Sequence, residues 1–206
     1  MYDKVVKRFL DFIIALLMTP FVLMVVIVFG ILIVVDDGFP IFYNSERRGK
    51  NGKVFYMFKL RSMKNDSPDI RDKDGSTFNS ENDSRLTKVG RFIRRYSIDE
   101  LPQIFNVLIG DMSFIGPRPS LVSTRYEELD DQKKKRLQVL PGVTGYSQAY
   151  YRNSISQAEK IKNDCWYVDN ISFATDVQIV IKTIQSILLH KNIYNHPNKE
   201  RSDEQK

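Results

Sequence analysis

The stretch RFIRRYSIDELPQIFNVLIGDMSFIGPRP, residues 91–119, is the one around which the chain is organised. It holds three arginines, an adjacent acid pair and a rigid segment in which an arginine stands between two prolines. These residues are Arg91, Arg94, Arg95, Asp99, Glu100, Pro117, Arg118 and Pro119. Cationic groups beside a carboxylate keep it ionised and hold the phosphates of a ligand next to it. The stretch therefore indicates phosphate chemistry.

The acid pair has a structural interpretation as well. Ser97 followed by Glu100 fits a capping box, and acids are favoured in the first turn of a helix. Pro102 is tolerated there because the earliest helical amides have no internal partner. The two interpretations are compatible, since a carboxylate at the start of a helix is also a well-positioned one.

Apolar residues at helical spacing predict two helical pieces within residues 88–109, which meet near Ser97. The two stripes consist of Val89, Phe92, Ile93 and Tyr96, and of Ile104, Phe105, Val107 and Leu108. Arg118 lies between two prolines, so its backbone is restricted. Little ordering entropy is then lost when Arg118 binds an anion.

The composition excludes several classes of protein. The chain has 206 residues and a net charge of +6, as expected for one domain-sized unit with a basic bias. A single cysteine, Cys165, excludes an internal disulfide. The basic residues are scattered around an acid pair and no groove-reading motif is present, so a nucleic-acid partner is not expected. The glycine-bearing turn at residues 141–145 lacks the spacing of a Walker A loop. A non-catalytic assembly protein remains an alternative.

An apolar run without a charged residue extends from Phe12 to Val35. A straight helix of that length crosses a bilayer core of about 30 Å. No small-residue cleavage pattern follows the run, which disfavours a cleavable signal peptide. The chain is therefore expected to be bound to a membrane.

Two features of this run argue against a simple span. Pro20 kinks a helix, and the Thr19 hydroxyl is placed to satisfy a carbonyl that the proline frees. Positive charges flank the run on both sides, at Lys4, Lys7, Arg8, Arg47, Arg48, Lys50 and Lys53. The positive-inside tendency would put both ends in the cytoplasm. We expect a re-entrant helix on the cytoplasmic face of the membrane, with a spanning helix as the alternative.

Residues 38–63 predict a turn followed by a hairpin, with Asn51-Gly52 as the turn signal. Lys59 and Arg61 share one face of an extended strand. They either contact the membrane surface or supply contacts to an anion. The polar stretch at residues 65–85 predicts a loop whose acids are solvated.

Two further helices are predicted towards the C-terminus. The charged helix at residues 126–140 contains a basic run, 133–136, that faces either water or anionic lipid. The amphipathic helix at residues 173–189 either closes the core or lies in the membrane interface. The polar residues 191–206 predict a disordered tail.

Five blocks of the sequence resemble the bacterial sugar transferases, the monotopic phosphoglycosyl transferases of glycan assembly. The blocks are KRFLDFIIALLMTP, FKLRSM, SIDELPQIFNVLIGDMSFIGPRP, PGVTGYSQ and YVDNISFATDVQIV. The resemblance implies a mainly helical α+β, monotopic membrane protein with a proline-kinked re-entrant helix, a short β-hairpin and interfacial amphipathic helices. It also implies an anchor at residues 1–37, a catalytic domain at 38–190 and a tail at 191–206.

The resemblance implies a reaction as well, the transfer of a phosphosugar from a UDP-sugar to undecaprenyl phosphate with release of UMP. The catalytic dyad of the family maps onto Asp99 and Glu100, its Pro-Arg-Pro segment onto residues 117–119, and its helix break onto Thr19 and Pro20. Asp99 is then expected to attack the β-phosphorus and to hold the phosphosugar covalently. Direct attack by the lipid phosphate, with Asp99 as a metal ligand only, is the alternative.

The expected ligands follow from this mechanism. Asp99 and Glu100 would bind Mg²⁺, because oxygen ligands suit a hard cation. The side chains expected to contact phosphate are Arg94, Arg118, Lys59 and Arg61. The other expected partners are membrane lipids and, as an open alternative, a second copy in a homodimer.

The sequence departs from the family pattern after the PGVTG block. Relatives often have Trp at the next position and Asn-Gly-Arg-Asn later, whereas this chain has Tyr146 and then YYRN at residues 150–153. This departure bears on which sugar is used. An N-acetylated hexosamine is expected from the resemblance alone.

Overall fold

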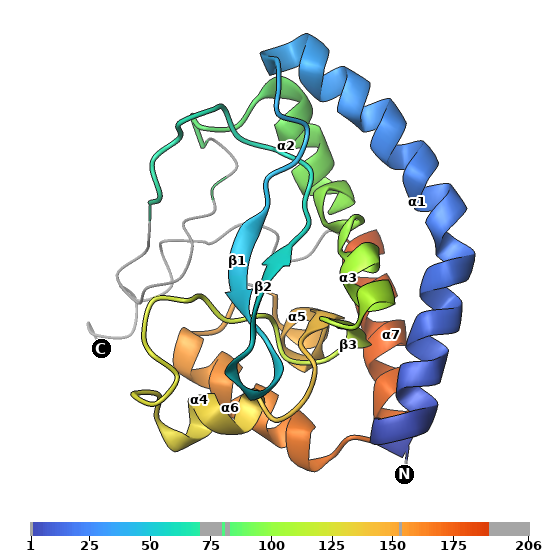
Figure 1. Cartoon of the computed structure of the whole chain (residues 1–206), viewed down its shortest axis with the longest axis vertical. Helices are drawn as coiled ribbons and strands as arrows, with labels where there is room; N and C mark the ends of the chain where they lie inside the picture. The colour runs from blue at the N-terminus through green and yellow to red at the C-terminus, as the bar shows by residue number, and fades with distance from the viewer. Residues whose placement is uncertain (1, 71–79, 81–82, 153, 190–206) are drawn as a thin grey trace, which may run out of the picture.

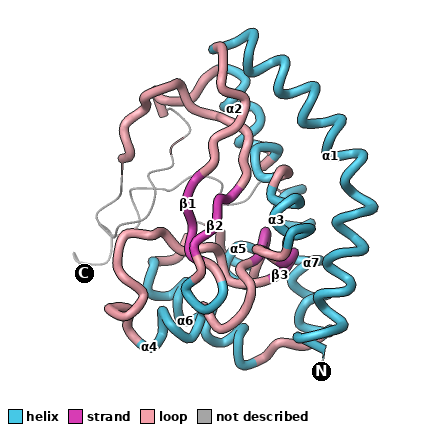
Figure 2. Tube along the Cα trace, in the orientation of Figure 1, coloured by secondary structure: helices cyan, strands magenta, loops and turns pink. Residues whose placement is uncertain are grey.

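The computed structural model consists mainly of helices around two small sheets (Figures 1 and 2). It describes residues 2–70, 80, 83–152 and 154–189. The α-helices are α1 (Lys7–Asp37), α2 (Lys88–Arg95), α3 (Gln103–Ile109), α4 (Asp131–Arg136), α5 (Tyr146–Tyr150), α6 (Gln157–Asp169) and α7 (Phe173–Leu188). The strands are β1 (Ser45–Arg48), β2 (Val54–Met57), β3 (Ser113–Ile115) and β4 (Gly142–Thr144). The predicted mainly helical α+β class is confirmed.

The apolar run forms α1, which lies along one side of the molecule and bows outward at its middle (Figure 1). Among the described residues, it is the one helix long and apolar enough to cross a membrane. The helix continues through Pro20. Thr19 Oγ1 donates a hydrogen bond of 2.8 Å to Ala15 O. The carbonyl that Pro20 deprives of an amide is that of Leu16, four residues earlier, so the predicted role of the Thr19 hydroxyl is wrong.

Only one stripe of α1 is buried in the protein. Ala15 and Val22 belong to the core cluster formed with the hairpin and α3. Ile33 packs with Leu60 and with α2. The other sides of the helix expose large apolar side chains, such as Leu17 with 75% of its surface accessible. A helix that is apolar all round and covered on one side needs an apolar medium on its other sides.

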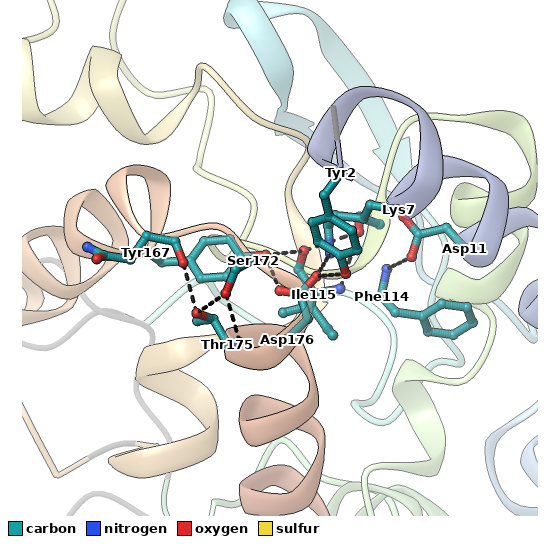
Figure 3. Close-up of polar contacts among 11 residues, drawn as sticks. Tyr2, Lys7, Asp11, Phe114, Ile115, Tyr167, Ser172, Thr175 and Asp176 are labelled. Carbon is teal, nitrogen blue, oxygen red and sulfur yellow. Dashed lines mark hydrogen bonds and ion pairs between the residues drawn. The ribbon is translucent and has the colours of Figure 1, made fainter.

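The start of α1 is fixed to α7 through a buried carboxylate (Figure 3). Lys7 Nζ lies 2.6 Å from Asp176 Oδ2, and the Tyr2 hydroxyl donates to the same oxygen at 2.7 Å. The Tyr167 hydroxyl, from α6, donates to Asp176 Oδ1 at 2.7 Å. Three donors therefore satisfy one buried carboxylate and join the start of the chain to α6 and α7.

Two further contacts hold the first turns of α1. Arg8 Nη1 donates to Val107 O at 2.7 Å near the end of α3, where a cation complements the helix dipole. Asp11 Oδ1 accepts a hydrogen bond of 3.1 Å from Phe114 N in β3 (Figure 3). The start of α1 therefore lies against the strand that leads to Arg118.

The end of α1 is fixed to the same body. Asp36 Oδ2 accepts a hydrogen bond of 2.8 Å from Val89 N in the first turn of α2. Asp37 pairs with the buried guanidinium of Arg61, which also donates to Gly38 O. These contacts and those of Lys7 attach both ends of α1 to one unit.

The predicted hairpin is confirmed. Strands β1 and β2 pair antiparallel, with Ser45 opposite Met57. In the turn, Asn51 has φ 54° and Gly52 has φ 81°, in the left-handed region that these residue types adopt readily. The buried side chain of Asn106, from α3, hydrogen-bonds the backbone at the end of β2 as acceptor at 3.0 Å and as donor at 2.8 Å. The hairpin is thereby fixed to α3.

A second sheet, which the sequence analysis did not predict, pairs β3 with β4 in parallel. Close backbone contact makes it possible, because a Cβ added to Gly145 would lie 2.1 Å from Gly116 O. That distance is too short for any side chain. The PGVTG block therefore packs directly on the backbone that precedes Pro117 and Arg118.

The two helical pieces meet near Ser97 as predicted, since α2 ends at Arg95 and α3 begins at Gln103. Ser97 itself has φ 57° and its side chain caps no helix, so the predicted capping box with Glu100 is wrong. The Ser97 amide donates to Arg94 O at 3.2 Å. The residue therefore ends α2 and does not begin α3.

Two charged segments also differ from expectation. In the part of residues 65–85 that the structure describes, Asp83 is buried and paired with Arg85 at 2.6 Å, not solvated. In the basic run at 133–136, Arg136 is buried. The predicted tail at residues 191–206 lies outside the described residues.

Candidate active site

Asp99 and Glu100 lie in a short 3₁₀ turn, Ile98–Glu100, between α2 and α3. Leu60 N donates a hydrogen bond of 3.0 Å to Asp99 O and attaches this turn to the segment after β2. Asp99 is only 4% exposed, and the side chain of Glu100 is 23% exposed. The acid pair therefore lies below the surface, with Glu100 as its more open member.

Lys59 contacts both carboxyl groups. Its Nζ lies 3.4 Å from Asp99 Oδ2 and 3.2 Å from Glu100 Oε1. Arg61, predicted to share a face with Lys59, directs its guanidinium to Asp37 and to carbonyls of the chain that follows α1. The structure thus brings Lys59 into contact with the acid pair, whereas Arg61 fixes the end of α1.

Arg118 approaches the acid pair from the loop after β3. Its Nη2 donates to Glu100 Oε1 at 3.0 Å, and about half of its side chain is exposed. The Arg118 carbonyl accepts a hydrogen bond of 2.7 Å from Arg136 Nη2, which also lies 2.6 Å from Asp164 Oδ2. Arg136 and Asp164 are both buried. This ion pair between α4 and α6 therefore holds the backbone of Arg118 in place.

Two more arginines act on the acid pair through their charge. Arg94, on α2, favours the ionised form of Asp99, and its Nη1 is buried without a hydrogen-bond partner among the described residues. Arg152, after α5, interacts electrostatically with Glu100. Lys59, Arg118 and these two arginines outnumber the two carboxylates. Such a surplus of positive charge suits a ligand with several negative charges, such as a diphosphate.

The surroundings separate the acidities of the two carboxyl groups. Burial raises the pKa of Asp99, and the nearby charge of Lys59 opposes this shift without cancelling it. Burial also disfavours ionisation of Glu100, but the charges of Arg118 and Lys59 outweigh it and hold the pKa of Glu100 well below its usual range. Paired carboxyl groups whose pKa values are driven apart are typical of sites in which the two have different chemical roles.

The acid pair offers oxygen ligands for a metal ion. Within the described part of the chain, no group of three or more His, Cys, Asp or Glu side chains converges. No described residue hydrogen-bonds Asp99 Oδ1 or Glu100 Oε2, so each carboxylate keeps one oxygen for ligation. Mg²⁺ uses one or two protein carboxylates together with waters and substrate phosphates. The residues fit Mg²⁺ bound in that way.

A buried acid pair, a surplus of cations around it and a long exposed apolar helix define a membrane-associated protein with a site for an anionic ligand. The chain belongs to the bacterial sugar transferase family, whose model, described as "Bacterial sugar transferase", matches residues 2–190. The family predicted from the sequence blocks is confirmed.

Named relatives support the assignment. The Bacillus subtilis (strain 168) protein "Uncharacterized sugar transferase EpsL" is 44% identical over 86% of this chain and 86% of its own length. The "Undecaprenyl-phosphate galactose phosphotransferase" of Salmonella typhimurium is 40% identical over 78% of this chain and 36% of its own length. An Aeromonas hydrophila protein named "UDP-N-acetylgalactosamine-undecaprenyl-phosphate N-acetylgalactosaminephosphotransferase" is 36% identical over 89% of this chain and 44% of its own length. This chain thus spans less than half of the latter two relatives.

Three residues that act on the site were not predicted from the sequence: Arg136, Asp164 and Arg152. Arg152 could have been found, because YYRN keeps the arginine of the Asn-Gly-Arg-Asn pattern while the residues before it change. Arg136 was hidden in a basic run that resembles a solvated helix face. Asp164 lies in a charged helix where neighbouring residues give no sign of its burial.

Proposed function

We propose that this protein is a phosphoglycosyl transferase that moves a phosphosugar from a UDP-sugar to undecaprenyl phosphate and releases UMP, as the first membrane-committed step of glycan assembly. The observation that carries the proposal is the buried carboxyl group of Asp99 among surplus cations, in a chain with a long exposed apolar helix. Relatives named as undecaprenyl-phosphate sugar phosphotransferases support this pair of substrates.

In the first step, a carboxylate oxygen of Asp99 attacks the β-phosphorus of the UDP-sugar. The bond from this phosphorus to the bridging oxygen breaks, and UMP leaves with the electron pair. Lys59 and Arg94 favour the ionised, nucleophilic form of Asp99. Arg118 stabilises the negative charge that develops on the phosphoryl oxygens, as bidentate arginine contacts match phosphate geometry. Glu100 stays ionised and orients both Arg118 and Lys59.

In the second step, a phosphate oxygen of undecaprenyl phosphate attacks the phosphorus of the covalent intermediate. The bond between that phosphorus and the Asp99 oxygen breaks, and the free carboxylate is restored. The product is a sugar linked to undecaprenyl diphosphate. One phosphoanhydride replaces another overall, so the reaction needs no ATP.

Asp99 and Glu100 would hold Mg²⁺ through the oxygens that no described residue hydrogen-bonds. The bound ion supplies charge neutralisation at the diphosphate. Lys59 contacts both carboxylates and also contributes to neutralising the negative charge of the diphosphate.

A second mechanism is direct displacement, in which the lipid phosphate attacks the UDP-sugar and Asp99 is a metal ligand only. The lipid phosphate is itself an anion that can attack the β-phosphorus unaided, so this route needs no covalent intermediate on Asp99.

Incubation of the enzyme with UDP-sugar in the absence of lipid separates the two mechanisms. The covalent route predicts a burst of UMP equal in amount to the enzyme and a phosphosugar adduct on Asp99 by mass spectrometry. Lack of both would support direct displacement. Asp99→Asn is expected to abolish turnover by either route and controls for contaminating activity.

The reaction itself is tested by a panel of UDP-sugars with undecaprenyl phosphate and Mg²⁺. The expected result is UMP release coupled to a lipid-linked product for one class of sugar. The resemblance favours an N-acetylated hexosamine, while the relatives are named for galactose and N-acetylgalactosamine. If no UDP-sugar gives a lipid-linked product, the proposed function is wrong.

We also propose that α1 enters and leaves the membrane on the cytoplasmic face. Its 31 residues extend over about 46 Å, longer than a bilayer core. A helix that crossed the bilayer would separate its two ends, whereas Lys7 and Asp36 both contact the same body. A homodimer stays a prediction.

The topology is tested by thiol labelling in closed vesicles. Asp3→Cys and Tyr43→Cys, each in a Cys165→Ser background, introduce exposed thiols before and after α1. Both should be labelled by an impermeant reagent from the cytoplasmic side. Labelling from opposite sides would support a spanning helix.

A further inference from the structure

An apolar groove lies between the second half of α1 and the segment 39–42. Its volume is about 390 Å³, within the range of ligand-binding pockets. The walls are formed by apolar residues, among them Val26, Ile31, Val34 and Ile41. The groove offers a UDP-sugar almost no polar partner. Burying the hydroxyls and the uracil of that substrate without hydrogen bonds is costly, so the groove does not suit a UDP-sugar.

The shape of the groove depends on one glycine. A Cβ on Gly30 would lie 3.2 Å from the Cγ2 atom of Ile41, so the glycine allows segment 39–42 to pack closely on α1. Beside this contact, Ile31 is 59% exposed. The groove is therefore open along the apolar side of α1 that faces the membrane in the proposed function, and its occupant comes from the lipid phase.

The floor of the groove also supports the acid pair. Val26 and Ile41 line the groove and pack on the same cluster as Ile98, the residue before Asp99. The wall residue Phe42 pairs with Leu60, and Leu60 N donates to Asp99 O at 3.0 Å. Two steps between hydrogen-bonded neighbouring segments thus lead from Phe42 in the groove wall to Asp99. At the ordinary spacing of neighbouring strands, the backbones of these two residues are about 10 Å apart.

The positive charge of Lys59 lies beside the acid pair, on the segment that pairs with the groove wall. The extended segments around the hairpin run side by side (Figure 2), with Tyr43 N bonded to Lys59 O at 2.9 Å. The Lys59 ammonium reaches both carboxylates. An apolar groove next to a cationic phosphate site matches a ligand with a phosphate head and a hydrocarbon chain.

We propose that this groove binds the first isoprene units of the polyprenyl acceptor and thereby directs its phosphate to Asp99. This inference rests on the proposed function and adds the place where the lipid substrate binds. The acyl chain of an ordinary phospholipid is the competing occupant, and the experiment below distinguishes the two.

Ile31→Trp fills the groove from an exposed position, and Leu17→Trp adds the same side chain to the exposed face of α1 outside it. In full-length protein reconstituted in nanodiscs, the Ile31 variant should raise the KM for undecaprenyl phosphate by about tenfold or more. Its lipid-free UMP burst and its KM for UDP-sugar should stay at the wild-type value. Leu17→Trp should leave all three unchanged. An unchanged KM for the lipid in Ile31→Trp would overturn the proposal.

A photo-crosslinking residue at position 31 or 17 reports the occupant directly, whether or not the groove variant is active. Labelled undecaprenyl phosphate in excess phospholipid should crosslink at position 31 and not at 17, and unlabelled undecaprenyl phosphate should compete. Equal labelling at both positions, or competition by phospholipid alone, would overturn the proposal. Wild-type protein that transfers no phosphosugar would instead refute the proposed function, and this inference with it.

Discussion

Lys7 and Asp176 form a buried ion pair of 2.6 Å although 169 positions separate them in the chain. The lysine begins α1 and the aspartate lies in the first turn of α7 (Figure 3). Tyr2 and Tyr167 complete the hydrogen bonds of the carboxylate. The pair therefore joins the membrane helix to the helix that closes the fold.

Lys7→Met should destabilise the protein by about 3 kcal/mol or more, because loss of one partner leaves the other charge buried without compensation. Tyr2→Phe should cost only about 1 kcal/mol, the typical contribution of one hydrogen bond. Thermal unfolding in detergent checks this order. The matched control is Lys53→Met, which removes an exposed lysine from its pair with Asp111 and should cost less than about 1 kcal/mol. Equal effects at positions 7 and 53 would contradict the structural role of the buried pair.

Arg118→Lys should lower kcat/KM for the UDP-sugar by about 10²-fold, because lysine keeps the charge but loses the two parallel donors that match a phosphate. Folding should be little affected, since about half of the Arg118 side chain is exposed. Steady-state rates at varied UDP-sugar concentration are the measurement. Arg125→Lys, in the exposed part of the same loop, is the control and should behave as wild type.

The parts of the fold that local sequence determines were predictable. The hairpin could be predicted from Asn51-Gly52, because a two-residue turn signal acts on its immediate neighbours. The Phe12 to Val35 run gave α1 because composition alone marks a long apolar helix. The Asp99–Glu100 pair was recognisable from its arginine surroundings and from the resemblance.

Features that depend on distant contacts were not predictable. Ser113 pairs with Gly142 in the parallel sheet, whose short strands show no alternation of apolar and polar residues by which they could be predicted. The capping box failed at Ser97 because the chain reverses there between two helices, which places the residue in the left-handed region. Arg61 was expected at the anion site, yet Asp37 at the end of α1 takes its guanidinium. Each of these contacts is decided by tertiary packing.

Helix α7 is expected to lie in the membrane interface while its other side closes the core. Asp176 and Ile179 are buried, whereas Val177, Ile181 and Ile184 form an exposed apolar stripe. A polarity-sensitive fluorophore on Ile184→Cys, in a Cys165→Ser background, should be quenched by lipid-borne quenchers when the protein is reconstituted in nanodiscs. Gln185 is the next residue and lies on the polar side of the helix. The same label on Gln185→Cys should be quenched much less. Equal quenching at both positions would contradict the interfacial orientation.

The buried pair of Arg136 and Asp164 predicts a pH-dependent stability. Burial raises the pKa of Asp164 to about 6, even though Arg136 and Ser147 oppose the shift. The folded state therefore binds this proton more tightly than the unfolded state, in which the pKa is near its ordinary value of 3.8. The contribution of Asp164 to the free energy of unfolding is largest below about pH 4, falls as the pH rises to about 6, and is constant above that.

Asp164→Asn removes this proton-binding group and leaves the buried charge of Arg136 without its anionic partner. The difference in unfolding midpoint between wild type and variant should therefore change between about pH 4 and pH 6 and be constant at higher pH. Asp169→Asn, at an exposed pair with Lys135, should follow the wild-type curve at every pH. Because Arg136 also holds the Arg118 carbonyl, Asp164→Asn should lower kcat more than it raises the KM for UDP-sugar. Parallel stability curves for wild type and Asp164→Asn, together with an unchanged kcat, would show that the pair neither titrates in this range nor positions Arg118.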